Sequence, residues 1–269
     1  MVVEAVGGVL SGSLALLADA GHMLTDSMAI ALSYFALWLT GRKTSPQRTY
    51  GFRRAEILAA FVNALGLVLL ALWIVAEAVE RLSTPHPVDA GILLWVALAG
   101  LAVNLVAYRL LHLSARTNLN IRAALWHVIG DVLGSIGVIV AALVIWFTGW
   151  TPIDAFISIG IAVLIGIGGG RILYDSTNLL LDSVPRAVDA ESVSDFLAAY
   201  PEVREICDLH IWGINSSETM LTAHLVVGEG IDRDAFLHSL LGALKERFRL
   251  VHMTVQLEST PLDSCEPNW

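Results

Sequence analysis

Long apolar runs separated by short polar loops fill the chain as far as about residue 182. Five runs are long enough, at about 1.5 Å per residue, to cross a hydrocarbon core of about 30 Å. The pattern predicts membrane-spanning helices near 14–40, 55–81, 88–112, 121–147 and 153–181. The first apolar run, residues 1–10, has only about half the length of a span. We interpret it as the shortened remainder of a sixth helix, left by a truncated sequence or a misassigned start, since no basic segment precedes it as in a signal peptide.

The pattern changes near residue 188, where charged residues become more frequent and the apolar runs shorten to strand length. The spacing predicts, in this order, a helix, two strands, a helix and a strand: 189–200, 203–212, 220–228, 231–248 and 252–258. This order indicates a small α+β domain. We therefore divide the chain into a transmembrane domain, residues 1–185, and a second domain, residues 186–269. The second is small enough that pairing with another copy would help to stabilise it.

Composition agrees with a membrane protein. Of the 269 residues, 56% are hydrophobic and 15% are charged, and the mean hydropathy is +0.69, which is outside the range of soluble globular domains. The formal net charge of -9 argues against a nucleic-acid binder and favours cationic partners in addition to the lipid bilayer. The two cysteines, Cys207 and Cys265, are too few for a disulfide framework or a four-thiolate zinc site.

Basic residues gather in two of the predicted loops. The loop after residues 14–40 and the region that joins 88–112 to 121–147 contain most of the basic residues of the predicted membrane domain: Arg42, Lys43, Arg48, Arg53, Arg54, Arg109, Arg116 and Arg122. Short loops that retain Lys and Arg lie in the cytoplasm. With the shortened first run counted as a span, both termini are expected to be cytoplasmic. The arginine-rich base usage suggests a bacterium, and so its cytoplasmic (inner) membrane.

Two ionisable pairs lie within the predicted spans: His22 with Asp26, and His127 with Asp131. Positions i and i+4 are about 40° apart around a helix and about 6 Å apart along it, so each pair offers an imidazole and a carboxylate on one face. Two nitrogens and two carboxylate oxygens suit tetrahedral Zn²⁺, and partly Co²⁺ or Cd²⁺. Ionisable residues at membrane depth are costly, so a functional site is the default interpretation.

A purely structural role stays open for these pairs, as a hydrogen-bonded clasp between packed helices. Gly130, Gly134 and Gly137 are small enough to allow another helix to approach the helix of Asp131 closely. One turn before His22, Asp19 shares its face and is either an entrance carboxylate or a solvated residue at a helix end.

Four segments resemble the cation diffusion facilitator family, in its zinc-transporting branch. They are Ser11–Asp26, Tyr50–Glu56, Trp126–Asp131 and Asp208–Trp212, and the resemblance covers essentially the whole chain. It implies six transmembrane helices, a ferredoxin-like cytoplasmic domain, a homodimer, and export of a divalent metal in exchange for protons. It also implies an intramembrane transport site at His22, Asp26, His127 and Asp131, in which His at the first position is similar to the zinc-selective pattern and would disfavour Cd²⁺ and Mn²⁺.

The resemblance also marks departures from the family. Some members bind a second metal in the loop after the second helix, through an Asp and two His. The matching positions here are Ser45, Arg48 and Phe52, so we expect that site to be absent. A charge pair between the third and sixth helices is retained as Arg54 with Asp182, although a solvated pair of helix-end charges is an equal alternative.

In the second domain the resemblance implies a further metal site, whose ligands map to Cys207, His224 and Glu258. Gln256 stands where some members have His, and Cys265 near the end of the chain is a further candidate. Strand alternation places Cys207 on the same face as Leu209 and Ile211, so a buried, inert cysteine is the alternative.

The sequence therefore predicts a proton-coupled efflux transporter for Zn²⁺ that works by alternating access at a four-ligand site. A membrane-tethered metal sensor, with a fixed structural zinc ion in the membrane, is the alternative. An intramembrane zinc enzyme is disfavoured, because four protein ligands would leave the metal no open position and no His-Glu-x-x-His motif is present.

Overall fold

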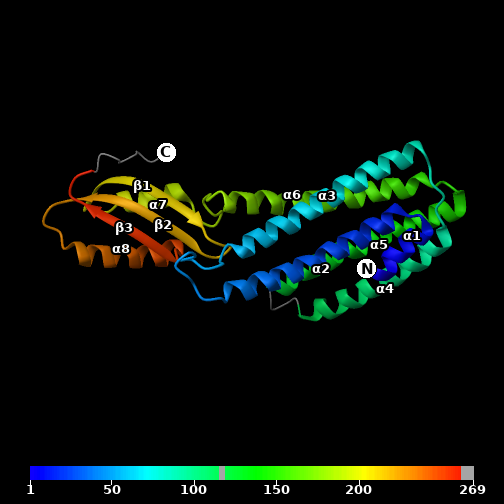
Figure 1. Cartoon of the computed structure of the whole chain (residues 1–269), viewed down its shortest axis with the longest axis horizontal. Coiled ribbons are helices and arrows are strands. Elements are labelled where there is room, and N and C mark those ends of the chain that lie inside the picture. Colours follow the sequence, from blue (N-terminus) through cyan, green and yellow to red (C-terminus); the bar gives the residue numbers. More distant parts are fainter. Residues whose placement is uncertain (115–118, 262–269) are drawn as a thin grey trace. The chain divides into compact units, whose positions relative to one another are not determined.

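The computed structural model describes residues 1–114 and 119–261, with side chains described except at 113, 114, 119–123 and 126 (Figure 1). Arg116 and Cys265 therefore lie outside the described residues, and the side chain of Arg122 is not described. The described chain forms two compact units. The first comprises Met1–Leu32 and Val62–Leu173, and the second comprises Ser33–Phe61 and the chain from Tyr174 onward.

The first six helices of the described residues are α1 (Val2–Ser11), α2 (Leu14–Thr40), α3 (Ala55–Ser83), α4 (Ala90–Ser114), α5 (Leu119–Thr148) and α6 (Pro152–Leu180). By length and composition, five of the described helices can cross a membrane, and α1 is a shorter apolar helix. This confirms the predicted spans to within about two residues at most ends. Local chemistry sets several boundaries, since Gly12 and Gly149 adopt positive φ after α1 and α5, and Pro152 occupies the first position of α6.

Small and branched apolar residues pack the first unit in two clusters. One joins α2, α3 and α6 through residues such as Ala18, Ile74 and Ala162. The other joins α2, α4 and α5 through residues such as Leu16, Leu93 and Val138. α2 contributes to both clusters, and its two apolar faces therefore hold α3 and α6 on one side and α4 and α5 on the other.

A buried carboxylate caps the start of α2 from another helix. Asp154, in the first turn of α6, is 2% exposed and accepts hydrogen bonds from the backbone N–H of Leu14 at 2.7 Å and from the hydroxyl of Ser13. The preceding turn is held by Arg81 of α3, whose Nη1 donates to the Gly12 carbonyl at 2.6 Å. Free N–H groups at a helix start need acceptors, and here the acceptor also fixes α6 against the α1–α2 turn.

The second unit contains α7 (Ala190–Ala198), β1 (Val203–Gly213), β2 (Thr219–Val227), α8 (Arg233–Phe248) and β3 (His252–Glu258) (Figure 1). The order helix, strand, strand, helix, strand is the predicted one. β2 is the central strand, antiparallel to β1 and parallel to β3. Side-chain carboxylates of Asp189 and Asp232 cap the starts of α7 and α8, and the Ser192 hydrogen bonds lower the pKa of Asp189.

One face of the sheet holds the core of this unit. Leu221 and Leu225 of β2 and Ile211 of β1 pack with Leu197 of α7 and Leu244 of α8. Both helices therefore cover the same face. The opposite face includes Thr222 and His224 of β2, by the alternation of side chains along a strand.

A β-bulge in β1 corrects the predicted side-chain alternation. Cys207 pairs with His224 and His210 pairs with Thr222, so three steps along β1 match two along β2. Asp208 within this bulge has a φ of 49°, a positive value that is rare outside glycine. The extra residue reverses the alternation, and Cys207 lies on the face of His224 rather than with Leu209 and Ile211 as predicted.

Asp154→Ala is expected to lower the free energy of unfolding by about 1–3 kcal/mol, because it leaves the buried Leu14 N–H and Ser13 hydroxyl without their acceptor. Thermal unfolding in detergent measures the change. Asp89→Ala is the matched control, since Asp89 is an exposed cap that accepts from Gly91 and Ile92 of its own helix. A shift for Asp154→Ala no larger than that of the control would contradict the capping role.

Candidate metal centre

The two predicted His-x-x-x-Asp pairs meet across α2 and α5. The Nε2 atom of His127 lies 3.1 Å from Oδ2 of Asp26 and 3.8 Å from Oδ2 of Asp131. The Nε2 atom of His22 lies 3.7 Å from Oδ2 of Asp26 and 3.9 Å from Oδ1 of Asp131. Each imidazole therefore has a carboxylate neighbour on its own helix and another on the facing helix.

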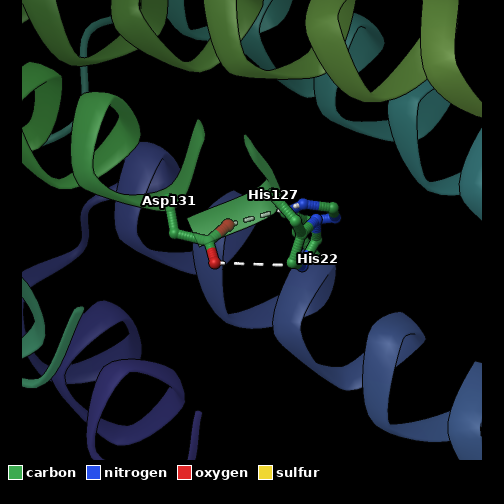
Figure 2. A group of neighbouring side chains, drawn as sticks. All are labelled: His22, His127 and Asp131. Atoms are coloured by element: carbon green, nitrogen blue, oxygen red, sulfur yellow. Dashed lines mark ion pairs between the residues drawn. The ribbon is translucent and has the colours of Figure 1, made fainter. Parts of the chain in front are cut away.

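These contacts require α2 and α5 to run antiparallel at the site, since the first residue of each motif meets the last residue of the other. The two imidazole rings are 5.5 Å apart between centroids, in an edge-on arrangement. Figure 2 shows His22, His127 and Asp131 pointing toward one another; a ligand atom from each lies within 4.8 Å of those from the other two. Asp26 joins the group through its contacts with both histidines.

The site opens into a cavity of about 380 Å³ in the first unit. The four side chains line it together with Asp19, and the remaining wall is apolar or glycine, including Leu67 of α3 and Ile165 and Gly168 of α6. None of the four ligand candidates is fully buried, with side-chain exposures from 17% to 48%. The arrangement combines two nitrogen donors and two carboxylates with an access path, which suits reversible binding of a divalent cation.

The wall contributed by α6 was not predicted from the sequence. Gly169 lies where α6 comes close to α3, and a Cβ added there would stand 2.8 Å from the Cβ of Leu67. A Cβ added at the neighbouring Gly168 would have no atom within 4 Å. The four glycines at 166 and 168–170 are the sequence signal for this close approach.

The candidate metal ligands of the second domain, Cys207, His224 and Glu258, share one face of the sheet. This is the face opposite to the helices. His224 lies beside Cys207 on β1 and Gln256 on β3, and its Nδ1 atom is 3.1 Å from Oε1 of Glu258. Cys207 is fully buried and disulfide-bonded, and Glu258 is 7% exposed. The carboxylate of Asp208 is 3.6 Å from the same His224 nitrogen. Asp208 was not predicted as a neighbour of His224, because only the bulge brings it there.

In the second unit, the loop before α3 contacts the α+β domain. Arg54 forms the predicted ion pair with Asp182. Arg53 forms another with Glu218, at 2.6 Å, and the Ser216 hydroxyl donates to Glu56 at the same distance. Neither of the last two contacts was predicted, since they join residues about 160 positions apart.

The three positions expected to lack a second loop site also lie in this unit. Ser45 and Arg48 pair across a tight turn, and the Arg48 guanidinium carbon lies 4.3 Å from the centre of the Phe52 ring.

Two family domains match the chain in succession. Residues 1–181 match the cation efflux transmembrane domain, and residues 185–260 match the cytoplasmic domain of cation efflux proteins. The chain is thus a multi-pass membrane protein that belongs to the cation efflux, or cation diffusion facilitator, family, whose members are transporters rather than enzymes. The intramembrane enzyme is accordingly set aside.

Several curated relatives match nearly the whole chain. "Zinc transporter ZitB" of Escherichia coli (strain K12) is 44% identical over 263 residues, which cover 97% of this chain and 84% of the relative. "Cadmium, cobalt and zinc/H(+)-K(+) antiporter" of Bacillus subtilis (strain 168) is 38% identical, over 96% of this chain and 85% of the relative. "Metal cation efflux system protein CzcD" of Cupriavidus metallidurans is also 38% identical, over 99% and 84%.

Gly169→Ala is expected to destabilise the first unit by about 1–3 kcal/mol, because the Cβ of Leu67 is close to its own backbone and cannot rotate away. Gly168→Ala is the control and is expected to leave stability unchanged or slightly raised, since alanine favours the helix and meets no neighbour. Thermal unfolding of both variants in detergent measures the difference. Equal midpoints would show that α6 and α3 do not need glycine at residue 169.

Proposed function

We propose that the chain exports Zn²⁺ by proton-coupled antiport, with His22, Asp26, His127 and Asp131 as the transport site. The observation that supports this most directly is the convergence of two nitrogens and two carboxylates from antiparallel helices on one cavity. The names of the relatives agree with it, since one is a zinc transporter and another an antiporter of cadmium, cobalt and zinc. Co²⁺ and Cd²⁺ are therefore the alternative substrates to test.

The spacing of the four groups suits a tetrahedral zinc ion. With ligand bonds of about 2.0–2.2 Å, neighbouring donor atoms of a tetrahedral site are about 3.3 Å apart. The four nitrogen–oxygen distances, between 3.1 and 3.9 Å, lie around this value. Small side-chain rotations would bring the donors to bonding distance, and the incomplete burial of the site leaves room for an ion to enter and leave.

Competition between the metal and protons supplies the coupling. Zn²⁺ binds only the deprotonated imidazole nitrogen, so loading the site releases protons and reprotonation expels the metal. When the site faces the cytoplasm it binds Zn²⁺. When a rocking of the helices exposes it to a more acidic exterior, protons replace the metal on the same groups.

The proposed orientation places both termini and the domain from about residue 186 in the cytoplasm, with the loop that carries Arg42, Lys43 and Arg48 on the same side. The transmembrane domain then comprises residues 1–185 and lies in the cytoplasmic membrane of a bacterium.

We further propose that the functional unit is a homodimer, because the second domain is small and belongs to a dimerising type of family domain. Its mass in detergent, measured by light scattering, tests this.

Asp131→Ala is expected to reduce zinc flux at least about 100-fold, because the remaining three ligands bind the ion weakly and cannot balance its charge. Purified protein in liposomes with an imposed pH gradient, loaded with a zinc-sensitive dye, measures the flux. Asp131→Asn is the isosteric companion variant. Asp195→Asn, an exposed position on α7, is the control and should transport at the unsubstituted rate.

Different outcomes of this experiment separate the alternatives. Flux that survives in Asp131→Ala would contradict the proposed site. Flux that does not respond to the pH gradient would contradict proton antiport. Zinc binding without any movement across the membrane would favour the membrane-tethered sensor. Replacing Zn²⁺ with Cd²⁺ in the same assay tests the expectation that His at residue 22 disfavours the larger ion.

We also propose a metal site in the cytoplasmic domain at His224 and Glu258, with Cys207 in its reduced form and the Asp208 carboxylate as further donors. The contacts of His224 with Glu258 and Asp208, on the same face as Cys207, support it.

His224→Ala in the full chain is expected to lower the number of tightly bound Zn²⁺ ions by one while Asp131-dependent binding persists. Elemental analysis after gel filtration counts the ions. An unchanged count would contradict this second site. His238→Ala is the control.

A further inference from the structure

Asp19 is a buried carboxylate that the four-ligand site does not use. It lies three residues before His22 on α2, about 4.5 Å nearer the start of that helix. It is 5% exposed, and no hydrogen bond or ion pair to it is found in the described part of the chain. It nevertheless lines the same cavity as His22 and Asp131. A solvated helix-end residue is therefore excluded, because the side chain is enclosed.

The surroundings of Asp19 form a polar strip that leads away from the transport site. Its Oδ1 atom is 3.7 Å from the Cβ position of Gly134, one turn beyond Asp131 on α5. The next residue, Ser135, is 2% exposed and accepts a hydrogen bond from the Asn104 amide on α4 at 3.2 Å.

A second buried acid continues this strip. The Oε1 atom of Glu4, on α1, would meet a Cβ at Gly100 at 2.7 Å, and the same position is 3.9 Å from the Ser135 hydroxyl. Glu4 is 5% exposed, and its other oxygen lies 2.6 Å from the Met1 amine. Asp19 and Glu4 are thus both 5% exposed, and both lie near the α5 segment 134–135.

An enclosed carboxylate without a partner is costly, and like charges nearby increase that cost. A divalent cation in the cavity would compensate for both. Carboxylate oxygens also suit a transient binding site, because a site with few protein ligands binds Zn²⁺ weakly and releases it quickly. Asp19 lies toward the α1–α2 turn, which is the end of the helices opposite to the loop that carries Arg42 and Lys43.

We propose that Asp19, with Glu4 further along the same polar strip, is a second and transient cation site through which Zn²⁺ passes between the four-ligand site and the exterior end of the helices. This inference rests on the proposed transport function. The transient site takes the ion as it leaves His22 and Asp131, so it affects the rate of passage and contributes little to the equilibrium affinity of the main site.

Asp19→Asn tests the transient site, since the amide keeps the shape of the side chain and removes its charge. Zinc affinity is measured in detergent by competition with a chromogenic indicator, and initial flux is measured in liposomes. The expected result is a maximal rate lowered at least about tenfold, with a dissociation constant within about threefold of the unsubstituted value. Glu80→Gln, at an exposed position near the end of α3, is the control and should change neither quantity.

An unchanged rate in Asp19→Asn would overturn the proposal. So would a loss of affinity as large as the loss of rate, because Asp19 would then belong to the main site or to the fold. Should Asp19→Asn fail to fold, Asp19→Glu takes its place: a lowered rate with retained affinity supports the transient site, and an unsubstituted rate overturns it. If the unsubstituted chain shows no zinc flux, the proposed transport function is contradicted. A result seen only in the Asp19 variants bears on the Asp19 proposal alone.

Discussion

The placement of ionisable side chains among apolar helices constrains the first unit more than any other feature. A histidine or carboxylate at membrane depth needs a partner, and both must come from neighbouring protein because lipid offers none. Spacing of four residues gives each of α2 and α5 one imidazole and one carboxylate on a single face. The cross-helix contacts of Asp26 with His127 and of His22 with Asp131 then fix the helices as antiparallel and in one register.

This constraint explains the packing around the site. α2 must hold its ligand face toward α5 while its other faces pack against α3 and α6, so small residues such as Ala18 and Ala162 occur where the helices meet. The Asp154 carboxylate fixes the start of α2 from α6, and Arg81 holds the turn before it. The beginning of the ligand helix is thus defined by hydrogen bonds, while its middle is left with access to a cavity.

Much of this could be predicted from the sequence, because it depends on local patterns. Runs of apolar residues define the five long helices, and alternation with turn residues defines the strands of the second unit. The four site residues were found because each pair is separated by one helical turn, which is visible without knowing the fold. Their mutual distances required the structure, yet antiparallel pairing is the only arrangement that brings each histidine to the carboxylate of the other motif.

The remaining features depend on contacts between distant parts of the chain, which no local pattern reports. Asp154 is about 140 positions from the backbone that it caps, and Gly169 is needed only because Leu67 faces it. Cys207 was assigned to the wrong face, since alternation assumes a regular strand and the extra residue at Asp208 breaks it. The irregular backbone at Asp208 is therefore the reason why strand alternation predicted the wrong neighbours for Cys207.

That bulge has a consequence for how the chain can change during evolution. Deleting one residue between Cys207 and His210 would restore a regular strand and turn every side chain on one side of the deletion to the opposite face. The Cys207 side chain would then enter the hydrophobic core, and no substitution of a ligand would be needed to lose the group around His224. In homologous chains, a length difference of one residue in this strand therefore carries as much information as the identity of the residues themselves.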